Sequence, residues 1–297
     1  MTWMLCTSAL YVALLGSFPL FSAPGGPSPE HTNQDQKAAI RKTEIPFELF
    51  NDHLIIVKGT IGSIGNVNIM LDTGKSPTAI SKDTADQLNL RGNRESLLMS
   101  NGRIEVQSVI LSRMQIGALH AEFFRVIVQD LSLMERKLGI SIGGIAGLDI
   151  LSANSFMIDY RKRRIVFGPT EASRKAVRFD TRLPFLTVKA TIKGQEVRLL
   201  VDSGTSGLLL YRKRFKATLP LATDQDPLIS TAAGPMPAQW FRASEVSLGK
   251  ENLGPQLIVI GDLDPDPRYD FDGLLGFRNL GFRRVWFDFE NGLFRWD

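Results

Sequence analysis

The feature that most constrains this chain is a short motif that occurs twice. Residues 67–74 read Val-Asn-Ile-Met-Leu-Asp-Thr-Gly, and residues 197–204 read Val-Arg-Leu-Leu-Val-Asp-Ser-Gly. In each copy an apolar run that is typical of a buried strand ends at an aspartate, Asp72 or Asp202. Burying a carboxylate beside such a strand costs free energy unless a partner stabilises it or the acid performs a function. Two such acids in two copies of one unit therefore indicate a shared site.

The repeat continues well beyond the two aspartates. An apolar-apolar-Gly sequence ends at Gly147 in the first copy and at Gly276 in the second, 75 and 74 residues after Asp72 and Asp202. Such glycines allow a chain to pass close to the backbone of the aspartate turn. Further apolar strands are predicted at 156–160 and 165–167 in the first copy and at 285–289 and 293–296 in the second. Matched motifs at nearly equal spacing are far more specific than either motif alone, so the two halves are interpreted as copies of one β unit.

These paired motifs resemble the aspartic protease superfamily, in its two-lobed retropepsin-like or pepsin-like form, over residues 46–297. The resemblance implies an all-β fold of two homologous, β-barrel-like lobes with an active-site cleft between them. It also implies that Asp72 and Asp202 are the catalytic acids and share one water. The residues that the resemblance assigns to support of these acids are Thr73, Gly74, Ser203, Gly204 and Thr205. The hydroxyl residues at 73 and 203 would cross-link the two turns, and the glycines would let backbone amides approach the acids.

Two carboxylates a few ångströms apart cannot both ionise readily, so they share one proton. The ionised acid can then take a proton from water, which attacks an amide carbon, while the protonated acid donates toward the carbonyl oxygen. The resemblance thus implies an aspartic endopeptidase acting on a peptide or protein substrate. Which of Asp72 and Asp202 carries the proton is left open by the sequence.

Lys75 departs from the family pattern, because a small residue usually follows the first glycine, and Thr205 stands there in the second copy. This departure supports an alternative function, a non-catalytic peptide-binding protein that retains the fold. An ammonium group near the acids would lower both of their pKa values. Alternatively, the long side chain reaches solvent and leaves the acids unaffected. Both alternatives remain open at this point.

Asn101 and Gly102 separate two apolar runs and predict a two-residue hairpin turn, since Asn-Gly accepts positive φ angles. By resemblance this hairpin is a candidate flap over the substrate, and the competing interpretation is an ordinary surface hairpin. The chain has no tyrosine between Tyr11 and Tyr160, so the segment resembles the simpler flap of retroviral-type proteases. Elsewhere, strands are predicted at 54–57, 67–71, 126–130, 185–192 and 196–201, and a short helix within 78–90.

The chain is predicted to divide into five segments. These are a signal peptide or N-terminal anchor at 1–23, a flexible spacer at 24–45, the first lobe at 46–168, a polar connection at 169–183, and the second lobe at 184–297. Residues 2–23 carry no charge and include a mostly apolar run, which is typical of a secretory signal and approaches the length of a membrane span. We therefore expect a secreted or periplasmic protein, with a membrane-anchored form facing outside the cytoplasm as the alternative. Cys6, the only cysteine, lies in this first segment, so the exported part would contain no disulfide.

The remaining patterns argue against other functions. The formal net charge is +4, but the basic residues are dispersed, and the dense run at 161–164 is best interpreted as a solvated turn rather than a nucleic-acid site. The acidic residues at 262–266 lack the glycine and glutamate positions of a calcium loop. The three histidines form no zinc motif and have no nucleophile-elbow serine to activate. No metal, no cofactor and no nucleic acid are expected, and the protein is predicted to be a monomer.

Overall fold

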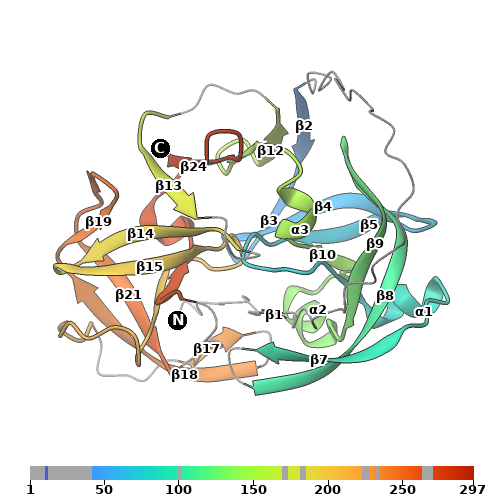
Figure 1. Cartoon of the computed structure of the whole chain (residues 1–297), viewed down its shortest axis with the longest axis horizontal. Coiled ribbons are helices and arrows are strands. Elements are labelled where there is room, and N and C mark those ends of the chain that lie inside the picture. Colours follow the sequence, from blue (N-terminus) through green and yellow to red (C-terminus); the bar gives the residue numbers. More distant parts are fainter. Residues whose placement is uncertain are drawn as a thin grey trace, which may run out of the picture.

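The computed structural model describes residues 11–12, 42–99, 102–168, 173–180, 185–222, 228–231, 234–262 and 270–297. Strands dominate these ranges, and they form two lobes that each contain one copy of the repeated unit. Figure 1 shows the first copy in blue and green on one side and the second in yellow to red on the other. The predicted all-β, two-lobed fold is therefore confirmed.

The elements of the first copy follow the predicted strands closely. They are β2 (Thr43–Pro46), β3 (Glu48–Phe50), β4 (Leu54–Ile61), β5 (Ile64–Leu71), β6 (Ala79–Ser81), α1 (Lys82–Gln87), β7 (Asn93–Met99), β8 (Gly102–Ile116), β9 (Leu119–Gln129), α2 (Ser132–Leu138), β10 (Gly144–Ala146), α3 (Leu148–Leu151), β11 (Phe156–Asp159) and β12 (Arg164–Phe167). The two-residue strand β1 (Tyr11–Val12) pairs with β7. The helix expected within 78–90 is present as α1, and Ser81 caps it by accepting the Thr84 N–H at 3.1 Å.

The second copy repeats this order of strands with fewer helices. Its elements are β13 (Ala176–Asp180), β14 (Thr187–Ile192), β15 (Gln195–Val201), β16 (Leu208–Tyr211), β17 (Leu228–Thr231), β18 (Gly234–Ala243), β19 (Val246–Leu248), β20 (Glu251–Asn252), β21 (Gln256–Gly261), β22 (Gly273–Leu275), the 3-10 helix η1 (Arg278–Leu280), β23 (Arg284–Asp288) and β24 (Leu293–Trp296).

Two of the predicted boundaries differ from the observed elements. Strand β2 begins at Thr43, inside the segment assigned to the spacer, because it pairs with β12 from Thr43 to Pro46. The connection predicted at 169–183 contains β13, which pairs with both β14 and β24. Polar composition concealed this strand, since its pattern of exposure gives it only one buried residue, Phe179.

A sheet formed by both copies joins the lobes. Its order is β13-β24-β23-β11-β12-β2, and we call these six strands the bridging sheet. Strands β11 and β23, which are equivalent in the two copies, pair antiparallel from Phe156 opposite Phe287 to Asp159 opposite Arg284. The rings of Phe156 and Phe287 stack with their centroids 4.6 Å apart, inside a hydrophobic core that extends through both lobes.

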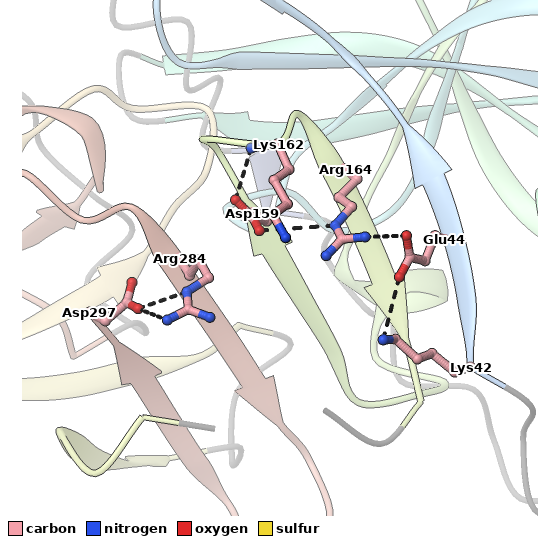
Figure 2. A network of polar contacts seen from close by, with 7 residues as sticks. All are labelled: Lys42, Glu44, Asp159, Lys162, Arg164, Arg284 and Asp297. Carbon is pink, nitrogen blue, oxygen red and sulfur yellow. Dashed lines mark hydrogen bonds and ion pairs between the residues drawn. The ribbon is translucent and has the colours of Figure 1, made fainter. Parts of the chain in front are cut away.

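Charged residues tie the strands of the bridging sheet together at one end, as Figure 2 shows. Arg164 on β12 forms an ion pair with Glu44 on β2, and its Nε lies 4.0 Å from an oxygen of Asp159 on β11. On β23, the Nε of Arg284 donates to Asp297 at 2.7 Å. The basic run at 161–164 is a turn between β11 and β12, as predicted, and its last residue enters the sheet.

Candidate active site

The two aspartates occupy the same position in their respective lobes. Asp72 follows β5, which pairs in parallel with β10, and Asp202 follows β15, which pairs in parallel with β22. The N–H of Asp72 donates to the carbonyl of Ala146 at 3.0 Å, and the N–H of Asp202 donates to the carbonyl of Leu275 at 3.0 Å. Each acid is thus fixed at the end of a buried strand by the apolar-apolar-Gly strand of its own copy.

The glycines that end these motifs lie against the turns that follow the acids. A Cβ atom on Gly147 would stand 2.6 Å from the carbonyl oxygen of Lys75, and one on Gly276 would stand 2.1 Å from that of Thr205. Real Cβ atoms do not approach backbone atoms so closely. The predicted role of these glycines, close approach to the aspartate turns, is confirmed.

The two turns are cross-linked by reciprocal hydrogen bonds. The N–H of Thr73 donates to Oγ of Ser203 at 3.0 Å, and the N–H of Ser203 donates to Oγ1 of Thr73 at 3.0 Å. Each hydroxyl also donates across the interface, Thr73 to the carbonyl of Val201 at 3.0 Å and Ser203 to that of Leu71 at 3.3 Å. All eight participating groups are buried, so the bonds fix the position of one acid relative to the other.

The carboxyl groups face one another across the two motif glycines. Asp72 is 2% exposed and Asp202 is 0% exposed. Gly74 N–H donates to Oδ1 of Asp72 at 2.9 Å, and Gly204 N–H donates to Oδ1 of Asp202 at 2.8 Å. A Cβ atom on Gly74 would lie 2.4 Å from Cγ of Asp202, and one on Gly204 would lie 3.0 Å from Oδ2 of Asp72. Glycine at both positions is therefore a condition for the close approach of the two acids.

The electrostatics of the pair are asymmetric. Burial raises the pKa of Asp72 well above its ordinary value, and the neighbouring Asp202 raises it further, while the charge of Lys75 acts in the opposite direction. Asp202 accepts a second hydrogen bond, from Oγ1 of Thr205 to its Oδ2 at 2.8 Å. A donor of this kind stabilises the carboxylate form of its acceptor. The arrangement can therefore hold one proton, on the Asp72 side of the pair.

Lys75 is completely buried, so the alternative that its side chain reaches solvent is wrong. Its Nζ donates to Oε1 of Gln129 at 3.4 Å. Burial lowers the pKa of Lys75 to about 7, against the attraction of Asp72 and Asp149, which raises it. The sequence could not give this direction, because it depends on how the end of β9 and α3 pack over the turn.

The structure contains the predicted hairpin, with a different turn. Strands β7 and β8 pair from Asn93 opposite Ser108 to Met99 opposite Gly102, so Gly102 belongs to a strand rather than to the turn. The other predicted turn residue, Asn101, lies outside the described residues. The register explains the difference, because it leaves residues 100 and 101 between the paired ends.

A second hairpin occupies the equivalent place in the second copy and was not predicted. Strands β17 and β18 pair up to Thr231 opposite Gly234, 29 residues after Asp202, whereas β7 ends 27 residues after Asp72. Pro235 and Pro237 concealed it, since proline argues against a strand in sequence patterns. Both hairpins run along the lower edge of the molecule in Figure 1. The equal spacing from the acids was the signal that could have revealed it.

The described residues contain no group of three or more histidine, cysteine, aspartate or glutamate side chains that could hold a metal ion. Within the same ranges, the helices are too short and too polar to cross a membrane.

The comparison with protein families agrees with this geometry. The sequence model of the aspartyl proteases matches residues 57–150 and 188–278, which cover both aspartate turns and both glycine strands. Because the match extends over more than half of the chain, the protein belongs to the aspartyl protease family. No curated protein matches the chain.

Proposed function

We propose that this protein is an exported aspartic endopeptidase that hydrolyses peptide bonds with a water activated between Asp72 and Asp202. The observation that carries the proposal is the reciprocal bonding of Thr73 and Ser203, which holds two buried carboxyl groups face to face. Such a pair supplies one acid and one base at the same time. Membership of the aspartyl protease family supports the same class of reaction.

The asymmetry of the site supports an assignment of roles within the pair, which we call the dyad. Asp202, which accepts hydrogen bonds from Gly204 and Thr205, is the base and takes a proton from the bound water. The water oxygen then bonds to the amide carbon while protonated Asp72 donates its proton toward the carbonyl oxygen. In the second step the proton held by Asp202 passes to the amide nitrogen, the carbon–nitrogen bond breaks, and the proton on the former carbonyl oxygen returns to Asp72. The dyad ends with one proton, as it began.

The substrate on this proposal is an extended peptide bound as an added strand. The β7–β8 hairpin is proposed as a flap over that peptide, and β17–β18, at the matching distance from Asp202, as its counterpart in the second lobe. Two hairpins at equivalent positions favour the retropepsin-like form of the fold. The protein is proposed to act as a monomer, since one chain supplies both aspartate turns.

The alternative function is a peptide-binding protein that kept the fold without catalysis. Buried Lys75 beside Asp72 favours it, since this basic group lies where the second copy has a hydroxyl. A fully ionised dyad bound to an ammonium group would be inactive, and a binder of this kind would show unchanged peptide affinity when an acid is replaced.

A cleavage assay separates the two functions. A fluorescently labelled mixture of denatured proteins is incubated with the protein between pH 3 and 8, with and without an inhibitor that mimics the tetrahedral intermediate. We expect inhibitor-sensitive cleavage that Asp72→Asn and Asp202→Asn each reduce by at least about a thousandfold, because each change removes half of a shared-proton pair. Near-native turnover in either variant contradicts the dyad, provided that circular dichroism shows the same fold.

Export is proposed from the uncharged N-terminal segment, which lies outside the described residues apart from Tyr11 and Val12. Mass spectrometry of the native protein tests this, and a mature N-terminus near residue 23 in the extracytoplasmic fraction is expected. A chain that begins at Met1 in the membrane fraction would indicate an uncleaved anchor instead.

A further inference from the structure

Lys75 occupies a place in the first copy that a hydroxyl residue occupies in the second. In the second copy, Oγ1 of Thr205 donates to Oδ2 of Asp202 at 2.8 Å, and the N–H of Thr205 points back to the carbonyl of Asp202 at 3.4 Å. In the first copy, the N–H of Lys75 makes the matching backbone bond to Asp72 at 3.3 Å. The backbone is therefore repeated, but the hydroxyl donor is replaced by a side chain that can carry a full positive charge.

The position of this side chain is determined by the fold around it. Lys75 is 0% exposed, and its carbonyl accepts the N–H of Leu148 at 2.7 Å, which holds the turn against α3. Its Nζ reaches Oε1 of Gln129, the last residue of β9, at 3.4 Å. A long cationic side chain normally extends to solvent, so its burial under the dyad indicates a function.

Two carboxylates act on the buried ammonium group from different elements. Asp72 belongs to the same turn, and Asp149 lies on α3; β9 contributes the neutral Gln129. Both oxygens of Asp149 accept hydrogen bonds from Thr78, Oδ2 from its N–H at 2.9 Å and Oδ1 from its hydroxyl at 2.8 Å. These bonds stabilise Asp149 as a carboxylate. Lys75 is thus electrostatically coupled to one acid of the dyad and to a second acid outside it.

We propose that Lys75 is a positioning residue of the dyad, whose buried ammonium group favours the carboxylate form of Asp72 and thereby sets the pH range in which the two acids share one proton. The proposal rests on the proposed function of Asp72 and Asp202 and adds a regulatory group to it. The second copy, with Thr205, has no such charge.

The direction of the effect follows from the charges. An ammonium group stabilises each more negative state of the dyad, so it lowers the pH at which the first proton leaves and the pH at which the second leaves. The range with one shared proton is displaced toward acid. Because burial lowers the pKa of Lys75 to about 7, the ammonium group itself is lost near neutral pH, and its effect on Asp72 is lost with it.

The pH dependence of cleavage tests this proposal. The variant Lys75→Met removes the charge and keeps a long unbranched side chain. We measure kcat/KM for the labelled denatured proteins from pH 3 to 8 and expect both limbs of the profile to move up by about one pH unit, which is roughly a tenfold change in activity at a fixed pH on either limb. A role in packing alone would change stability or overall rate without moving the limbs.

Lys82→Met is the matched control. Lys82 lies on α1, its side chain is 61% exposed, and its Nζ pairs with Asp130 at 3.0 Å, directly after Gln129. Its profile should superimpose on that of the parent. If Lys75→Met does not fold, Lys75→Thr reproduces the residue found in the second copy and is expected to move the limbs in the same direction. Superimposable profiles for the folded Lys75 variant and the parent would overturn the proposal.

A second measurement does not depend on cleavage. In protein labelled with carbon-13 at the lysine Cε, the Lys75 signal is identified by its loss in Lys75→Met and is titrated by NMR. Replacing Asp72 with asparagine removes an attractive charge, so the Lys75 titration should move to lower pH. An unchanged titration overturns the coupling, whether or not the protein cleaves peptides. A shifted titration in a protein that cleaves nothing supports the coupling and rejects the proposed protease function.

Discussion

At the scale of single residues, the pair of acids was within reach of the sequence, and the behaviour of Lys75 was not. Two motifs at equal spacing from two glycines placed Asp72 and Asp202 in one site, because a repeated unit positions equivalent residues equivalently. The direction of a four-carbon side chain has no such constraint. It depends on the packing of Gln129 and Asp149, which lie 54 and 74 residues further along the chain.

Burial of Lys75 predicts an unusual dependence of stability on pH. The pKa of Lys75 is about 7 in the folded protein, against the model value of 10.5. Between these values the unfolded chain binds a proton that the folded protein does not, so this residue makes the free energy of unfolding rise with pH. Between pH 7 and 9 the expected gain over Lys75→Met is of the order of 3 kcal/mol. Urea unfolding of both proteins at the two pH values measures it.

Lys82→Met serves again as the control, since an exposed lysine should leave the pH dependence of the parent unchanged. If the stability difference between the parent and Lys75→Met is the same at pH 7 and pH 9, Lys75 is not buried as an ammonium group. Asp72 contributes with the opposite sign in the acid range, because its pKa is raised on folding and stability is lost as the pH rises through that range.

At the scale of elements, strands with an apolar pattern were predictable, and those with proline or polar composition were not. The strands that carry the acids were recognised because β5 and β15 end in uninterrupted apolar residues. Strand β18 contains Pro235 and Pro237, and β13 has a single buried residue, so local patterns did not identify them. Both are strands because of pairing with distant segments, which overrides local preference.

The glycine strands β10 and β22 give a prediction at this scale. Gly276→Ala would place a Cβ atom 2.1 Å from the carbonyl oxygen of Thr205, so the turn that carries Asp202 must move. We expect a loss of about 1–3 kcal/mol of stability and at least a hundredfold loss of kcat/KM, since misplacement by an ångström is enough for such a loss. Gly65→Ala is the control, because a Cβ atom there meets nothing within 4 Å. Equal activity of the two variants would show that the turn tolerates displacement.

At the scale of the whole molecule, the sequence indicated two copies of a β unit, and the structure shows that the copies share a sheet. The closing strands were predicted in each half, but their pairing across halves was not, because neither strand contains a signal for its partner. The pairing of β11 with β23 brings residues about 130 positions apart into register, Phe156 opposite Phe287. The lobes are therefore not independent units, since the core is continuous through this sheet.

A continuous core predicts that damage to the bridging sheet destabilises both lobes together. Phe287 is fully buried and packs against Phe156 with ring centroids 4.6 Å apart and against Phe294 at 5.6 Å. We expect Phe287→Ala to lower the free energy of unfolding by about 3–5 kcal/mol. Hydrogen exchange should report the loss equally in β5 of the first lobe and β15 of the second, because both depend on the same cooperative unit. Phe123→Ala, at a side chain that is 77% exposed on β9, should change stability by less than about 0.5 kcal/mol. Loss of protection confined to β15 would show that the lobes unfold separately, and the relative position of Asp72 and Asp202 would then depend on the cross-linked turns alone.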